Sequence, residues 1–96
     1  MGTGLIGRAA PDLGRADLRR ALEAEYRALE YSSAGQVVPW SGGSAGLRGE
    51  VVAYQPYRVG SQDCRQYAHS VYAAATPQTV RGTACRNADG SWSPLV

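Results

Sequence analysis

The feature that most constrains this chain is its pair of cysteines, which stand in two segments that suit a β-hairpin. Cys64 and Cys85 are the only two cysteines, and residues 63–73 and 78–86 around them are rich in strand-forming side chains. If Cys64 lies opposite Cys85 in an antiparallel pair, paired residue numbers sum to 149 and a four-residue loop, 73–76, joins the strands. That loop length is ordinary for a hairpin. The register that joins the cysteines is therefore the one that the turn favours.

A disulfide between these cysteines would close a loop of about 20 residues and stabilise the fold by roughly 3 kcal/mol. That is a large share of the stability of a domain of 96 residues. Disulfides persist in oxidising compartments, so the pair favours the periplasm or the cell exterior. Two unrelated buried thiols in a cytosolic protein are the alternative. A metal site is disfavoured, because two cysteines and one histidine fall short of four ligands and no C-x-x-C spacing occurs.

The composition indicates one globular domain. Hydrophobic residues make up 44% of the chain and charged residues 19%, and the net charge is +2. Basic and acidic residues alternate along the sequence, which is typical of a mixed solvated surface and not of a nucleic-acid-binding face. No nucleic-acid partner is therefore expected.

The first residues carry neither an export signal nor a convincing cofactor motif. Residues 1–7 lack the basic start and apolar run of a signal peptide. Gly2 to Gly7 fits G-x-G-x-x-G, but a dinucleotide site needs a strand before this loop, and none precedes it. A flexible leader or the end of a glycine-rich helix explains these glycines better, and no cofactor is expected.

A helix is predicted over residues 15–31, which are almost all good helix formers. Apolar residues recur at helical spacing along it, so one face packs against a core. An amphipathic helix that binds a partner is the alternative interpretation. The buried face is predicted to hold Leu18, Ala21, Leu22, Glu25, Tyr26 and Leu29.

After Gly35 the hydrophobic period changes from 3.6 to 2, which indicates strands. A short strand is predicted over 36–40, and Pro39 confines it to a sheet edge because proline cannot donate a ladder hydrogen bond. The next strand lies within 47–59, where Pro56 interrupts it.

Asp89 and Gly90 form a strong turn signal, and a short last strand follows over 91–93, with Pro94 marking another sheet edge. The sequence therefore predicts an α+β fold, with one N-terminal helix packed on an antiparallel meander sheet of four to five strands and one disulfide. The candidate core of the sheet is Val37, Val51 or Val52, Tyr54, Val71 and Val80.

Three motifs carry a family resemblance. Segments 40–49, 63–67 and 82–92 occur in the order and spacing seen in the C-terminal domain of the 17-kilodalton surface antigen family, the rickettsial-type outer-membrane lipoproteins. The most specific part is G-T-A-C-R-x-x-D-G-x-W, preceded by C-R-x-Y. The chain resembles this family from about Asp12 to its C-terminus.

The resemblance implies an order of segments and a location. Family members carry an export signal with a lipidated cysteine, then a glycine zipper, then this domain. Residues 1–11 are accordingly interpreted as a flexible leader or a remnant of the zipper, and residues 12–96 as the surface-antigen-like domain. The implied location is the cell envelope, at the outer membrane or in the periplasm, with membrane contact only through a lipid anchor that this chain does not contain. Residues 73–78 also lack the glycine pair expected in the hairpin of the family.

No motif in the sequence supplies a reaction, so the chain is not expected to be an enzyme. His69 is the only histidine, and no serine stands in a nucleophile-elbow pattern. His69 is interpreted as a packed or surface residue, and oxidised cysteines cannot attack a substrate. A small enzyme of the helix-plus-sheet type is kept as a third hypothesis, on shape alone.

The leading hypothesis is a noncatalytic surface-antigen domain of the cell envelope with a structural or interaction role. The alternative is a periplasmic binding or inhibitor module, for example against a cell-wall lytic enzyme. The expected partner is an envelope protein or a cell-wall component, and the sequence leaves the oligomeric state open. Trp92 has two interpretations, a lid over the core or a ligand-stacking residue. The candidate interaction surface consists of Trp40, Arg48, Arg65, Arg86 and Trp92.

Overall fold

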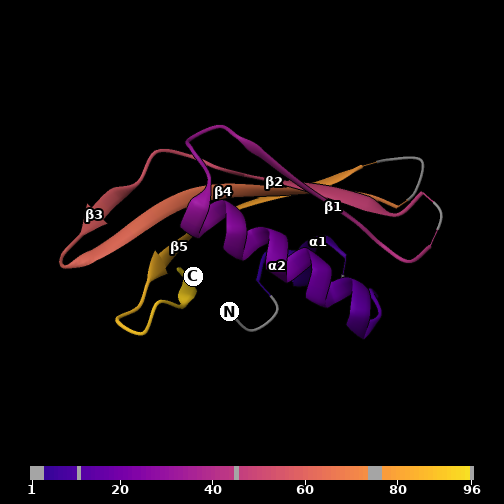
Figure 1. The fold of residues 1–96 in the computed structure, drawn as a ribbon, viewed down its shortest axis with the longest axis horizontal. Helices are drawn as coiled ribbons and strands as arrows, with labels where there is room; N and C mark the ends of the chain where they lie inside the picture. Colours follow the sequence, from indigo (N-terminus) through magenta and orange to yellow (C-terminus); the bar gives the residue numbers. More distant parts are fainter. Residues whose placement is uncertain (1–3, 11, 45, 74–76, 96) are drawn as a thin grey trace.

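The computed structural model describes residues 4–10, 12–44, 46–73 and 77–95 (Figure 1). One antiparallel sheet dominates the molecule, with strand order β1-β2-β4-β5-β6 and β3 paired to β4. The elements are α1 Ile6–Ala9, α2 Arg15–Tyr31, β1 Val37–Ser41, β2 Arg48–Ala53, β3 Tyr57–Val59, β4 Gln62–Tyr72, β5 Gln78–Arg86 and β6 Trp92–Leu95.

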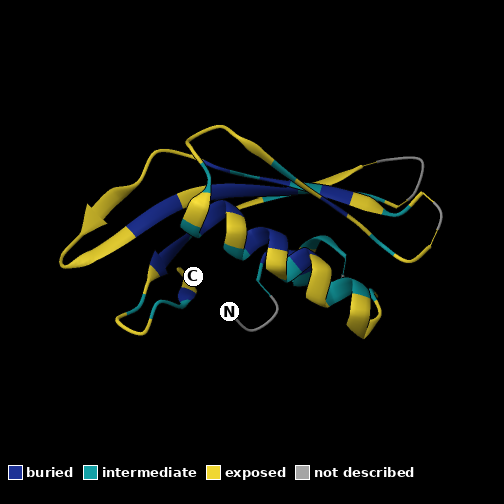
Figure 2. Cartoon of the chain, viewed as in Figure 1, coloured by how far each residue is buried: buried dark blue, intermediate teal, exposed yellow. Residues whose placement is uncertain are grey.

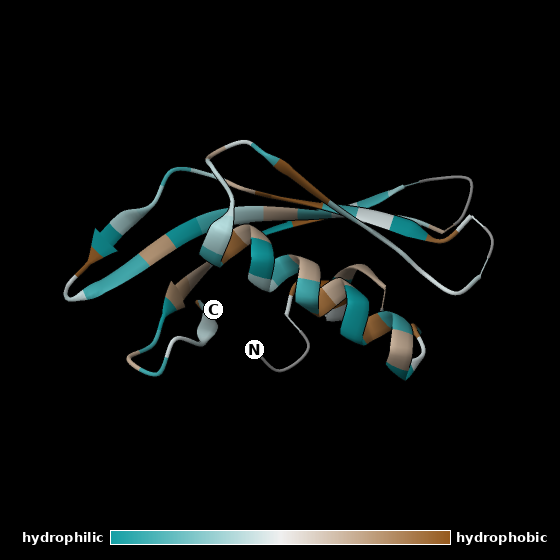
Figure 3. Ribbon diagram, viewed as in Figure 1, coloured by the Kyte–Doolittle hydropathy of each residue, from teal (hydrophilic) through white to brown (hydrophobic). Residues whose placement is uncertain are grey.

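Helix α2 has the bounds that the sequence predicts, and it packs across β1, β2 and β4 (Figure 1). Its buried positions face the sheet and its exposed positions face away, as the bands in Figures 2 and 3 show. Of the predicted face, Ala21, Glu25 and Leu29 are buried, whereas the remaining three positions are half-buried. Ala24 and Ala28 complete the buried stripe, and these small side chains let the helix lie close to the sheet.

The predicted register of the cysteine hairpin is confirmed. Cys64 lies opposite Cys85, Tyr67 opposite Gly82 and His69 opposite Val80. A disulfide joins Cys64 to Cys85. Most of the predicted loop, residues 74–76, lies outside the described residues.

The predicted fold class is wrong in its numbers of helices and strands. A single helix on a meander of four to five strands is expected from the sequence, but the described residues form six strands and a second short helix, α1. Pro56 divides the predicted strand 47–59 into β2 and β3, because proline cannot take part in a continuous ladder. Both pieces then pair with the long strand β4, so β3 stands off the main strand path.

The core lies between the helices and one face of the sheet. Val51 and Val71 of the predicted core are buried, but Val37 is 47% exposed and Tyr54 is 43% exposed. Alternate residues of a strand face opposite sides of the sheet. Val37 lies opposite Val52, and both stand on the sheet face that α2 does not cover. Val80 is half-buried.

Leu5 and Ile6, from the segment interpreted as a leader, are part of this core. They cover β5 at Gly82, where a Cβ atom would lie 2.8 Å from the Leu5 Cδ2 atom. A side chain at this position would displace the end of the Leu5 side chain from the strand.

The two edge prolines are where the sequence predicts them. Pro39 lies on β1 and Pro94 on β6, the two ends of the strand order. No helix in the described part of the chain is long and apolar enough to span a membrane.

Candidate functional site

Three polar side chains meet in the core between α2 and the sheet, and we call them the buried polar cluster. They are Glu25 of α2, Trp40 of β1 and His69 of β4. The Nδ1 atom of His69 lies 2.7 Å from the Glu25 Oε2 atom, and the Trp40 Nε1 atom lies 2.7 Å from the His69 Nε2 atom. Glu25 and His69 are fully buried.

The hydrogen bonds of this cluster determine the tautomer of His69. An indole N–H can only donate, so the Nε2 atom of His69 accepts from Trp40. The ring proton is then on Nδ1 and is donated to the Glu25 carboxylate. His69 is therefore a neutral imidazole with both nitrogens occupied.

Glu25 also accepts two hydrogen bonds from the backbone of the N-terminal segment. The Leu5 N–H donates to Oε1 at 3.2 Å, and the Ile6 N–H donates to Oε2 at 2.8 Å. All three partners of the carboxylate are donors, which matches an ionised, acceptor-only group. These bonds compensate for the removal of the charge from water.

This arrangement does not suit acid-base catalysis. A general base needs a free nitrogen within reach of a substrate, and the Nε2 atom of His69 is taken by Trp40. Neither side chain is accessible to a substrate in solution, because Glu25 and His69 are both 0% exposed. The cluster therefore holds α2, β1 and β4 together.

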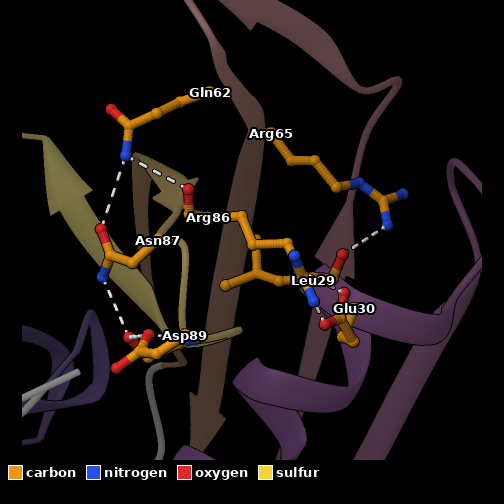
Figure 4. Close-up of polar contacts among 8 residues, drawn as sticks. Leu29, Glu30, Gln62, Arg65, Arg86, Asn87 and Asp89 are labelled. Carbon is orange, nitrogen blue, oxygen red and sulfur yellow. Dashed lines mark hydrogen bonds and ion pairs between the residues drawn. The ribbon is translucent and has the colours of Figure 1, made fainter.

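Arg65 of β4 caps the C-terminus of α2. Its Nη1 atom donates to the carbonyl oxygens of Ala28, Leu29 and Ser32 at 3.0, 2.9 and 3.0 Å, and its Nε atom donates to Tyr54 O at 2.8 Å. Figure 4 shows the side chain directed at Leu29. Burial lowers the pKa of the guanidinium from its ordinary value. A cation at this position complements the unpaired carbonyls and the dipole of the helix end.

Arg86, which follows the second cysteine, forms an ion pair with α2 at the surface. Its Nε atom donates to the two carboxylate oxygens of Glu30 at 2.9 and 3.3 Å (Figure 4). This hydrogen bond raises the pKa of the Arg86 guanidinium. The Gln62 side-chain amide donates to the Arg86 carbonyl oxygen at 3.2 Å, so both the backbone and the guanidinium group of Arg86 are hydrogen-bonded.

The motif residues after Arg86 form the turn between β5 and β6. The Ser91 hydroxyl and N–H donate to the Asp89 carboxylate at 2.6 and 3.0 Å, and these bonds lower the pKa of Asp89. Asn87 donates to the hydroxyls of Ser91 and Ser93 at 3.0 and 2.8 Å. Gly90 has φ 91°, which favours glycine and explains the Asp-Gly pair.

The five side chains predicted as an interaction surface do not lie together. Trp40, Arg65 and Trp92 are buried, and Trp92 belongs to the core cluster as its lid interpretation requires. Arg48 stacks on a tyrosine ring of β4, 4.1 Å from the ring centroid, and Arg86 lies at the other end of the sheet. Of the five side chains, only those of Arg48 and Arg86 are exposed to solvent.

The sequence does not reveal the partner of His69. The only signal is a glutamate, Glu25, within the predicted apolar face of the helix. A charged residue at such a position needs a buried partner, and the only histidine lies on a predicted strand. Spacing alone does not connect them, because they are 44 residues apart.

The chain is similar to a set of bacterial surface proteins. Residues 27–93 match the family described as 17 kDa outer membrane surface antigen. The 17 kDa surface antigen of Rickettsia prowazekii (strain Madrid E) is 37% identical over 76 residues, which cover 77% of this chain and 48% of the relative. Those of Rickettsia bellii (strain RML369-C) and Rickettsia rickettsii are 35% and 36% identical over 77 residues. Each match covers 79% of this chain and 48% of the relative.

The chain spans about half the length of these curated relatives. No solved structure is significantly similar to it. The family match begins at residue 27, near the C-terminal end of α2, and reaches into β6. It includes both cysteines, both arginines that follow them, and the β5–β6 turn. On this match, the chain belongs to the 17 kDa outer membrane surface antigen family.

Proposed function

We propose that this chain is a noncatalytic domain of the cell envelope, at the outer membrane or in the periplasm, with a structural or interaction role. The strongest support for a noncatalytic role is that the motif side chains make contacts within the domain itself. Cys64 and Cys85 form the disulfide, Arg65 caps α2 and Arg86 binds Glu30. Membership of a surface antigen family supports the envelope location.

The location and the disulfide are tested together in cells. The longer protein that contains this domain is expressed with an epitope tag, cells are fractionated, and thiols are labelled with a maleimide reagent that adds mass. We expect the protein in the envelope fraction, with both cysteines protected until a reductant is added. A cytosolic protein with two free thiols would contradict the proposal.

We also propose that a lipid anchor holds the longer protein to the membrane, as the family resemblance implies. Cells that express it are grown with an alkyne-labelled fatty acid, and the purified protein is examined for the label. Incorporation that is lost when an upstream cysteine is replaced supports the anchor. An unlabelled protein that detergent-free washing releases from membranes argues against it.

The alternative is a binding or inhibitor module, and the β3–β4 hairpin favours it. This hairpin projects beyond the end of α2, and all of β3 is exposed (Figures 1 and 2). Tyr57 and Val59 present apolar side chains on it, 41% and 50% exposed. Exposed apolar side chains on a projecting hairpin are suited to enter the cleft of another protein.

The inhibitor alternative is tested with a purified lysozyme and labelled cell walls. Inhibition should fall at least tenfold when Tyr57 and Val59 are both replaced by serine. Tyr31→Ser, which removes another exposed tyrosine, is the matched control and should change nothing. Full lysozyme activity at saturating concentrations of the chain would reject this alternative for that enzyme class.

A further inference from the structure

Residues 4–10, which we call the strap, are attached to the rest of the domain by few hydrogen bonds. The backbone bonds of α1 stay within the strap and the residues that follow it directly. In the described part of the chain, the strap bonds to another element only through the amides of Leu5 and Ile6, which donate to the Glu25 carboxylate. The polar attachment of the strap therefore depends on the charge of one side chain.

The strap otherwise packs through two apolar side chains. Leu5 and Ile6 are 3% and 0% exposed, and Leu5 lies over Gly82 of β5. Helix α1 packs on the same side of the sheet as α2 (Figure 1). Helix α2 is also bonded to β4 and β5 through two arginines that do not contact Glu25. Loss of the bonds to Glu25 should therefore free the strap before it frees α2.

The buried polar cluster has no acceptor left for a further proton. Its four donated hydrogens come from the amides of Leu5 and Ile6, the Nδ1 atom of His69 and the indole of Trp40, and they end on Glu25 or on the Nε2 atom of His69. A proton on Nε2 would remove the acceptor of the indole, and a proton on Glu25 would place an O–H among donors. Protonation at either group breaks a bond of the cluster.

The geometry indicates Glu25 as the group that takes the proton. The indole of Trp40 fills the space over Gly49, its partner on β2, so the ring is packed in place. A proton on the Nε2 atom of His69 would leave two N–H nitrogens facing each other at 2.7 Å. The Oε1 atom of Glu25 accepts only the 3.2 Å bond from Leu5, so a proton there disturbs one long bond.

The other ionisable groups near this pair do not titrate in acid. Burial and the charge of Glu25 raise the pKa of the Tyr67 phenol of β4, and the charge of Arg8 of α1 opposes this shift. A phenol is neutral and a guanidinium is charged throughout the acid range. The rest of the buried stripe of α2 is alanine and leucine, and valines lie opposite His69 on β2 and β5. An acid response of the cluster therefore comes from Glu25 and His69.

We propose that acid releases the strap. At neutral pH the ionised Glu25 accepts from both strap amides, and the strap covers Tyr67 and the face of β5 at Gly82. When the pH falls and Glu25 takes up a proton, residues 4–10 leave the sheet while α2 and the strands stay folded. The ionised form holds the strap, so the attachment is present at neutral pH and is lost toward acid. This property of the fold does not depend on the proposed envelope role.

The test is amide hydrogen exchange of the purified chain, compared between pH 7 and pH 4. Rates are expressed as protection relative to an unstructured chain at the same pH, which removes the effect of pH on the exchange chemistry. At pH 7 the amides of Leu5 and Ile6 should be as protected as that of Val51. At pH 4 their protection should fall at least about tenfold below that of Val51.

Glu25→Gln and Glu23→Gln are a matched pair on α2. Glutamine cannot ionise, so in Glu25→Gln the strap amides should be less protected than that of Val51 already at pH 7. Glu23 lies at an exposed ion pair, and its variant should keep the response of the parent.

A measurement on the parent decides the matter even if Glu25→Gln does not fold. The carbon shift of the Glu25 carboxyl group and the nitrogen shifts of the His69 ring are followed by NMR as the pH is lowered. The Glu25 carboxyl should titrate over the same pH range in which Leu5 loses its protection.

The inference fails if Leu5 and Ile6 stay as protected as Val51 down to the pH of global unfolding. It also fails if the His69 ring takes up the proton while the strap stays protected, because Glu25 then keeps its charge. Equal protection of the strap in Glu25→Gln and the parent at pH 7 would contradict it as well. None of these results bears on the envelope location, which fractionation tests separately.

Discussion

At the scale of single residues, Glu25 connects three parts of the chain that are distant in sequence. Its carboxylate accepts from the amides of Leu5 and Ile6 and from the ring of His69. All of these groups are buried. The same carboxylate therefore positions the N-terminal segment, the helix and the centre of the sheet.

Glu25→Gln tests this role. The glutamine NH₂ group replaces one acceptor by a donor and faces partners that are themselves donors, so we expect the free energy of unfolding to fall by about 2–4 kcal/mol. Urea titration followed by circular dichroism measures the change. Glu23→Gln, at the exposed pair with Arg27, should cost less than about 1 kcal/mol. Equal losses in the two variants would refute the role of the cluster.

Tyr67 gives a prediction about alkaline pH. Burial and the charge of Glu25 raise the pKa of its phenol well above the ordinary value of 10.0. A raised pKa means that the folded state favours the neutral phenol, so this stability is present below pH 10 and is lost as the pH rises above it. Tyr67→Phe should therefore flatten the loss of stability above pH 10.

The same substitution should cost little at pH 7. The Tyr67 hydroxyl is buried and has no hydrogen-bond partner in the described part of the chain. Removal of an unpaired buried hydroxyl should leave the free energy of unfolding within about 1 kcal/mol of the parent or raise it. Melts of both chains at pH 7 and pH 11 compare the two effects, and a parallel alkaline decline in Tyr67→Phe would contradict the assignment.

At the scale of elements, α2 depends on the sheet for its C-terminal end. No basic residue stands in its last turn, and Arg65 of β4 supplies the cation that bonds the last carbonyls. The cap is thus formed only when helix and sheet meet. Helix and strand are stabilised together and not separately.

Arg65→Met keeps much of the apolar stem but removes the four hydrogen bonds of the guanidinium. We expect a loss of about 2–4 kcal/mol, with faster amide exchange confined first to the last turn of α2. Arg27→Met on the same helix should have little effect, because its ion pair is exposed. Uniform exchange along α2 in Arg65→Met would argue against a capping role.

The elements predicted correctly are those that local signals determine. The bounds of α2 follow from periodicity and helix formers, and the β4–β5 register follows from loop length and the cysteines. The sequence shows that Pro56 interrupts a strand. It does not show that the two pieces, β2 and β3, pair with the same side of β4, because that depends on the length of β4. The burial of Leu5 and the bond between Glu25 and His69 depend on tertiary packing that no spacing encodes.

At the scale of the whole molecule, the helices cover one face of the sheet and leave the other uncovered by any described element (Figure 1). The open face carries polar pairs across the strands, such as Ser70 with Thr79 at 2.9 Å and Tyr72 with Glu50 at 3.0 Å. Such pairs suit a face that meets water. The molecule has a single apolar layer, so a crosslink contributes a large part of its stability.

Replacement of both Cys64 and Cys85 by serine should lower the free energy of unfolding by about 3 kcal/mol, because the disulfide closes a loop between residues 21 apart. Thermal unfolding with and without a reductant measures it. The parent chain in reductant should unfold at nearly the temperature of the serine variant. A melting temperature that neither treatment changes would show that the fold does not need the crosslink.

The bonds from Leu5 and Ile6 to Glu25 have a consequence for the timescale of local opening. Amides near the first residues of a domain ordinarily exchange with solvent within seconds, because chain ends fray. Here both amides donate to a carboxylate that lies fully buried in the core. In heavy water their deuterium uptake should proceed at the rate of global unfolding and match that of Val51 in the centre of the sheet.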